Sequence, residues 1–62
     1  MAEKLLTVPE VAEMTRLPEA TLRWFRHEGT KGPKSFKLGR RIVYRESDVL
    51  AWIENAYAED AR

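Results

Sequence analysis

A capping box, a proline and a glycine divide the first half of this chain into two short helices. The capping box comes first: the Thr7 hydroxyl can accept from the backbone N–H of Glu10, and the Glu10 carboxylate can reach back to the cap. We expect a first helix that starts at this box and ends near Met14 or Thr15. The spacing of its apolar positions predicts a buried side made of Val8, Val11, Ala12 and Thr15.

The second helix is bounded by Pro18 and Gly29. After a link of about three residues, Pro18 fits the first helical turn, where its missing N–H costs nothing, and Gly29 supplies the left-handed residue that ends a helix. Leu22 and Phe25 then point inward together. Two short helices joined by a tight turn form a helix-turn-helix unit, whose second helix enters the major groove of DNA.

A β-hairpin follows, because the pattern changes to period two over residues 35–44 and Gly39 marks a reversal. A loop of two residues would divide the apolar side chains between two faces, whereas an odd loop gathers them on one face. We therefore expect a three-residue loop over 39–41. The apolar side chains gathered in this way are Phe36, Leu38, Ile42 and Tyr44.

A third helix should start within a residue or two of Glu46, since Glu46 and Asp48 suit its positive end. Its buried stripe is Val49, Trp52, Ile53 and Ala56, flanked by Leu50 and Tyr57, and we expect these aromatic side chains in the core. Residues 58–62 lack a packing pattern and should fray. The predicted fold is mainly α-helical with a small β-hairpin. It is a single winged helix-turn-helix domain over residues 1–62, with three helices and a two-stranded wing.

The charges are divided unevenly along the chain. Nine of the eleven Lys and Arg residues lie between Arg16 and Arg45, where Glu19 and Glu28 are the only acids, so this basic block carries a formal charge of +7. The remaining residues sum to −6. A run of charges often only solvates a surface, but these fall on a short helix and a hairpin. That placement favours double-stranded DNA as the partner.

The candidate DNA contacts form two sets. On the second helix they are Glu19, Ala20, Thr21, Arg23, Trp24, Arg26 and His27. On the wing they are Lys34, Lys37, Arg40 and Arg41. The two helix arginines can reach base edges or phosphates, and consecutive arginines at a hairpin tip are typical of a wing that reaches the backbone or the minor groove.

Several of these residues have a second interpretation. Glu19 can accept from a cytosine amino group or only complement the helix dipole. Trp24 can close the core or lie against the sugar-phosphate backbone. Lys37 can simply protect an edge strand from aggregation. His27 has no second histidine or cysteine near it in sequence, so we expect an exposed or backbone-contacting role and no metal.

The composition argues against several other kinds of protein. Without cysteine there is no disulfide framework, thiolate zinc site or cysteine nucleophile. One histidine and no clustered carboxylates give no recognisable catalytic site, so we expect neither an enzyme nor a cofactor. No apolar stretch approaches the length of a membrane span, and the N-terminus lacks the apolar region of a signal peptide. The sequence predicts a cytoplasmic protein.

Four segments, taken in order, resemble the excisionase-type winged helix-turn-helix domain, a small relative of the MerR DNA-binding domain. They are residues 5–12, 21–29, 37–44 and 47–53, with the sequences LLTVPEVA, TLRWFRHEG, KLGRRIVY and SDVLAWI. The chain differs from many such domains at Arg16, where glycine is common, and at Pro18, where a serine cap is common.

The resemblance implies a DNA-binding protein with Thr21, Arg23 and neighbouring helix residues in the major groove and Arg40 and Arg41 on the wing. Phage members of this family are recombination directionality factors. They bind several sites near an integrase's attachment site, often cooperatively, and bend the DNA so that the integrase excises the prophage. The resemblance thus implies self-association on DNA and an integrase as a candidate partner.

Two other functions fit the same sequence. A small transcription regulator would use the same DNA-binding surface, and a protein-interaction module would dock its basic face on an acidic partner. Because no coiled coil follows in this sequence, we do not expect a ligand-sensing activator of the MerR type.

Overall fold

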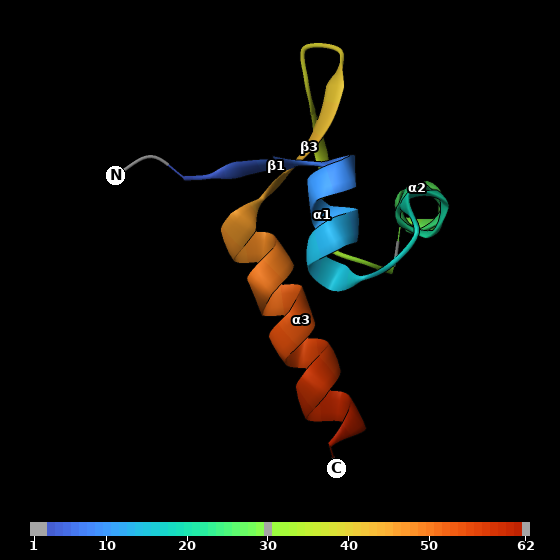
Figure 1. The fold of residues 1–62 in the computed structure, drawn as a ribbon, viewed down its shortest axis with the longest axis vertical. Coiled ribbons are helices and arrows are strands. Elements are labelled where there is room, and N and C mark those ends of the chain that lie inside the picture. Colours follow the sequence, from blue (N-terminus) through green and yellow to red (C-terminus); the bar gives the residue numbers. More distant parts are fainter. Residues whose placement is uncertain (1–2, 30, 62) are drawn as a thin grey trace.

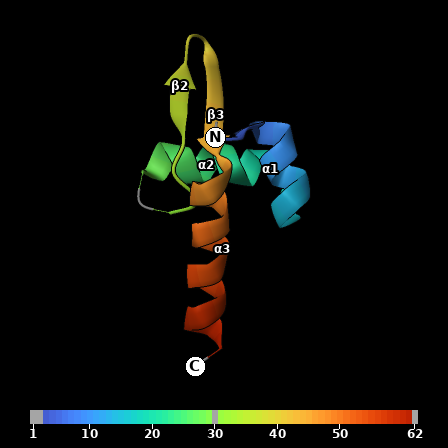
Figure 2. The same cartoon turned by 90° about the vertical axis from the view of Figure 1, so that its left-hand side faces the viewer.

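The computed structural model describes residues 3–29 and 31–61, in which three helices pack around a three-stranded antiparallel sheet (Figure 1). In chain order the elements are β1 (Leu5–Thr7), α1 (Val8–Thr15), α2 (Glu19–Glu28), β2 (Phe36–Leu38), β3 (Arg41–Arg45) and α3 (Glu46–Asp60). The β2–β3 hairpin projects from one end of the molecule and α3 from the other. After a quarter turn, α2 is seen to run across this long axis (Figure 2).

The predicted capping box is confirmed at the start of α1. The backbone N–H of Thr7 donates to Glu10 Oε1 over 2.8 Å, and the backbone N–H of Glu10 donates to Thr7 Oγ1 over 3.4 Å. These bonds to Thr7 lower the pKa of the Glu10 carboxyl below its usual value, because they stabilise the charged form. The helix ends at Thr15, as expected.

The turn between α1 and α2 depends on one residue in a left-handed conformation. Arg16, at the C-terminal cap of α1, has φ 63° and ψ 28°, a left-handed conformation that glycine adopts more easily than arginine. Pro18 was predicted in the first turn of α2 but is instead its N-cap, with extended φ and ψ, and its carbonyl accepts from Thr21 and Leu22. Gly29 ends α2 with φ 79°, as predicted.

The sheet contains a strand that the sequence analysis missed. β3 is central, with β2 on one side and β1 on the other. In the β1 pairing, Leu6 lies opposite Tyr44 and Thr7 opposite Val43. Three residues are too few to show an alternating pattern, so β1 was not distinguishable from the chain leading into the capping box.

The predicted three-residue hairpin loop is wrong. Leu38 lies opposite Arg41 and Phe36 opposite Val43, which leaves a two-residue loop with Gly39 at φ 66°. Such loops match the right-handed twist of paired strands when glycine supplies a positive φ. As a consequence of this turn, two apolar side chains remain outside the core: Phe36 is 39% exposed and Leu38 is 54% exposed.

The core lies where β1, β3 and the three helices meet. Its buried residues are Leu6, Val8, Val11, Leu22, Tyr44 and Val49, with Leu17, Phe25, Ile42 and Ile53 packed against them. The N-terminal half of α3 supplies Val49, and the helix starts at Glu46 as predicted.

The C-terminal half of α3 departs from the prediction. Trp52 is only half-buried, Ala56 is exposed, and Tyr57 is 70% exposed, so the expectation that Tyr57 is a core residue was wrong. Figure 1 gives the reason: α3 extends beyond the rest of the molecule, and its far end has no element to pack against. The helix continues to Asp60. Fraying of its end stays a prediction, and Arg62 lies outside the described residues.

Replacing Arg16 by glycine should stabilise the protein by about 1 kcal/mol, because glycine adopts the left-handed conformation without a steric cost, partly offset by a more flexible unfolded chain. The free energy of unfolding in urea measures this. Arg16→Ala is the control, since it removes the same charge but keeps the β-carbon. If both variants were equally stable, the charge and not the backbone would explain the effect.

Candidate nucleic-acid interface

The outward side of α2 carries the residues predicted there. Ala20, Arg23, Arg26 and His27 are exposed, and Glu19 and Thr21 are half-buried. Leu22 faces the core on the opposite side. This helix therefore presents an exposed basic surface, as a recognition helix requires.

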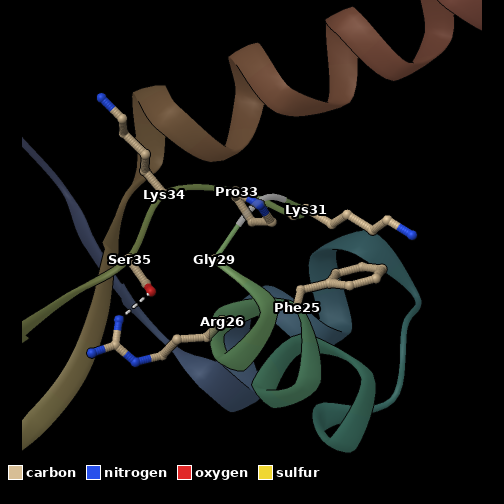
Figure 3. A pocket seen from close by; sticks show the side chains of 8 residues that line it. Phe25, Arg26, Gly29, Lys31, Pro33, Lys34 and Ser35 are labelled. Atoms are coloured by element: carbon tan, nitrogen blue, oxygen red, sulfur yellow. Dashed lines mark hydrogen bonds between the residues drawn. The ribbon is translucent and has the colours of Figure 1, made fainter.

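Polar contacts orient the two arginines of α2. Arg23 donates to Glu19 over 3.1 Å, and both side chains remain well exposed. Arg26 donates to the Ser35 hydroxyl over 2.6 Å, which ties the helix to the loop that leads into β2 (Figure 3). The structure thus shows a role of Glu19 that the sequence analysis did not consider, as the partner of Arg23 in an ion pair.

Trp24 does not lie in the core. It is 51% exposed, its ring centroid is 6.1 Å from that of Phe25, and Lys31 Nζ lies 5.9 Å from the centre of its ring. Trp52 is the tryptophan that turns inward, with its centroid 6.3 Å from that of Phe25. Lys31 belongs to this surface although the sequence analysis did not select it; its place in the basic block was the available signal.

The wing residues are exposed but occupy different positions. Arg40 lies in the two-residue loop, whereas Arg41 is the first residue of β3 and so is not at the tip. Lys37 is opposite Ile42 in the register. Lys34 lies before the hairpin, in the loop after α2.

A hollow joins the recognition helix to the wing. Its volume is ≈ 350 Å³, and its lining comes from the end of β1, the start of α1, α2 and β3. The lining residues are Thr7, Val8, Pro9, Arg23, Arg41 and Ile42. The structure therefore brings Arg23 and Arg41, predicted in separate sets, to one place. We call this space the helix–wing hollow.

The helix-turn-helix domain family matches residues 5–57, which is most of the chain. The chain belongs to this family. It is a DNA-binding family that includes excisionase-like proteins. No curated protein and no solved structure matches the chain.

A second hollow of this helix-turn-helix domain, of ≈ 360 Å³, lies at the end of α2 (Figure 3). Its lining includes Arg26, Lys31 and Lys34, but the two lysine side chains point away from each other and Arg26 is turned toward Ser35. Because these three side chains point in different directions, they are not arranged to bind one anion together.

Not every charge of the basic block is equally available to DNA. Arg45 donates through Nε and an η nitrogen to the two carboxylate oxygens of Asp48, over 2.9 and 3.2 Å. This hydrogen bonding lowers the pKa of Asp48 and raises that of Arg45. Arg23 and Arg26 lie close enough to Tyr44 to oppose the rise in its pKa that burial causes.

Two negative findings apply to the helix-turn-helix domain. Across residues 3–29 and 31–61, no group of three or more metal-binding side chains comes together. Within that same part of the chain, no helix has the length and apolar character needed to cross a membrane.

Trp24 should report DNA binding through its fluorescence. In a Trp52→Phe variant, Trp24 is the single tryptophan, and duplex DNA should change its emission because the exposed ring loses water on contact. The control is Trp24→Phe, in which half-buried Trp52 reports and should change little. Equal changes in both variants would indicate a rearrangement of the whole domain instead of contact at Trp24.

Proposed function

We propose that this protein is an excisionase-type architectural factor. It binds adjacent sites on double-stranded DNA cooperatively, bends the DNA, and so directs an integrase toward excision. The observation that carries the DNA-binding part is the joint exposure of basic residues on α2 and on the β2–β3 hairpin, with Arg23 and Arg41 on one shared hollow. The resemblance of the sequence to excisionases supports the recombination role.

In this proposal α2 lies in the major groove. Ala20 and Thr21 lie near its N-terminal end, where base edges and thymine methyl groups come within reach. The wing follows the backbone toward the next minor groove, and Arg40 in the loop provides the outermost charge. Lys31, beside Trp24, extends the basic surface past the end of α2.

The size of the protein favours several copies on DNA. One ten-residue recognition helix and one short wing cover about one face of the major groove and an adjoining minor groove, which is little for tight specific binding. We therefore propose a monomer in solution that associates on neighbouring DNA sites.

Some apolar side chains of the sheet are not used in the core, and their exposure supports self-association. By the strand register, Leu5, Phe36 and Leu38 share the outer face of the sheet with Val43, and all but Val43 are exposed. We assign this outer face to contact with a second copy.

DNA binding should depend strongly on salt. If ~5 to 7 basic residues meet phosphates, log affinity should fall against log salt with a slope of about −4 to −6. Arg40→Ala should make the slope shallower by about 1 and weaken all sequences similarly, since it removes one backbone contact. Fluorescence anisotropy between low and physiological salt measures both.

Lys4→Ala is the matched control for Arg40→Ala, because Lys4 is exposed but lies outside the basic block. Its slope should equal that of the wild type. A flat salt dependence of the wild type, together with tight binding to an acidic protein, would instead support the protein-interaction module.

Binding to two or three adjacent sites should be cooperative and should bend the duplex. Mobility shifts on DNA with one, two or three sites, combined with circular permutation, measure both properties. Leu38→Ser should reduce apparent affinity for the multiple-site DNA by about tenfold or more while leaving single-site affinity unchanged. The control is Tyr57→Ser, which removes an exposed apolar side chain far from the sheet. Equal, independent sites on unbent DNA would favour the transcription regulator.

A further inference from the structure

We infer that the helix–wing hollow holds one sugar-phosphate unit of the DNA backbone, with its phosphate bound jointly by Arg23 and Arg41. This inference rests on the proposed DNA binding and adds a specific site to it. It also assigns Arg23 to contact with the DNA backbone, whereas the sequence allowed contact with either a base edge or a phosphate.

The lining of the hollow has two parts of different chemistry. Val8, Pro9 and Ile42 provide apolar surface, and Val8 is almost fully buried. Arg23 and Arg41 also line the hollow, and both residues are exposed, so their guanidinium groups are accessible to an anion from solvent. With a volume of ≈ 350 Å³, the hollow is near the lower end of the usual range for small-molecule sites.

A nucleotide backbone unit has the same division of chemistry. Its deoxyribose ring offers carbon and hydrogen atoms to an apolar surface, and its phosphate offers oxygens to a guanidinium fork. A free inorganic anion would gain nothing from the apolar part of the lining. The combination of an apolar base with two arginines therefore favours a sugar-phosphate unit over a simple ion.

The existing contacts of the two arginines permit this binding. The ion pair between Arg23 and Glu19 is exposed, with side-chain exposures of 63% and 42%, so it contributes little and a phosphate can replace it. Arg41 forms no ion pair with another described residue. Neither arginine has to leave a buried partner in order to reach the DNA.

The position of the hollow gives this contact a further consequence. Arg23 belongs to α2 and Arg41 to the first position of β3, next to the wing loop, so a phosphate between them fixes both elements to the same point of one strand. Contact at this point sets the register of α2 in the major groove. Base recognition then falls to other residues of α2, with Thr21 and Ala20 nearest its N-terminal end.

The inference can be tested by neutralising single phosphates of the DNA backbone. The probe is a duplex selected by the wild-type protein from a random pool, in versions that each carry one uncharged methylphosphonate. On unmodified duplex, Arg23→Ala and Arg41→Ala should each weaken binding by about 10- to 100-fold without changing base preference. On the version neutralised at one particular phosphate, both substitutions should have almost no further effect.

Arg40→Ala is the matched control, since Arg40 is next to Arg41 but does not line the hollow. Its effect should persist on the version that makes Arg23→Ala and Arg41→Ala ineffective. The inference is overturned if these two substitutions become ineffective at different phosphates, or if Arg23→Ala changes base preference. Such results would leave salt-dependent DNA binding intact, whereas failure of the wild type to select any duplex would overturn the proposed function itself.

Discussion

The pairing of β1 with β3 is the contact on which the candidate DNA-binding surface depends. It places Leu6 opposite Tyr44, and both side chains are buried in the core. Because the chain passes directly from Thr7 of β1 into α1, this pairing fixes the start of α1 beside the base of the wing. Without β1 the hairpin would be a two-stranded ribbon held to the body through the side chains of β3, and isolated two-stranded hairpins are marginally stable.

The orientation of α2 comes from the other end of α1. The left-handed Arg16 turns the chain, and the Pro18 carbonyl accepts the first hydrogen bonds of α2. This orientation places Leu22 in the same core as Leu6 and Tyr44. The helix–wing hollow exists because the β1–β3 pairing and the turn at Arg16 act on opposite ends of the same short helix, α1. The β1–β3 pairing fixes one end of α1 beside the wing, and the turn at its other end fixes the position of α2.

Sequence patterns predicted the features that are encoded within one turn of helix. The capping box at Thr7, the glycine stop at Gly29 and the start of α3 at Glu46 were all found, because each is a local match between a residue and a backbone conformation. Arg23 and Arg41 were both selected as candidate contacts, but nothing in the sequence indicated that they share a hollow.

The features that were missed depend on distant parts of the chain. β1 forms only because β3 offers it a partner, and three residues carry too little pattern to reveal that. The hairpin register was argued from the burial of Phe36 and Leu38, whereas Gly39 and the twist of the strands decide it. Tyr57 was assigned to the core by helical spacing, which gives the face of a residue but not whether another element covers that face.

If the protein binds DNA as proposed, the distribution of ion pairs implies an order of events. Arg45 is held by two bonds to Asp48, which offset its charge, whereas the bond of Arg26 to the neutral Ser35 hydroxyl leaves its charge in place. Arg40 in the wing loop has no ion pair with a described residue, so it can meet the phosphates first. Arg23 must exchange Glu19 for a phosphate, and it can do so only when α2 is already close to the DNA. In the proposed complex, the wing therefore contributes to the long-range attraction, and the exchange at Arg23 is a short-range step that requires α2 to lie correctly in the groove.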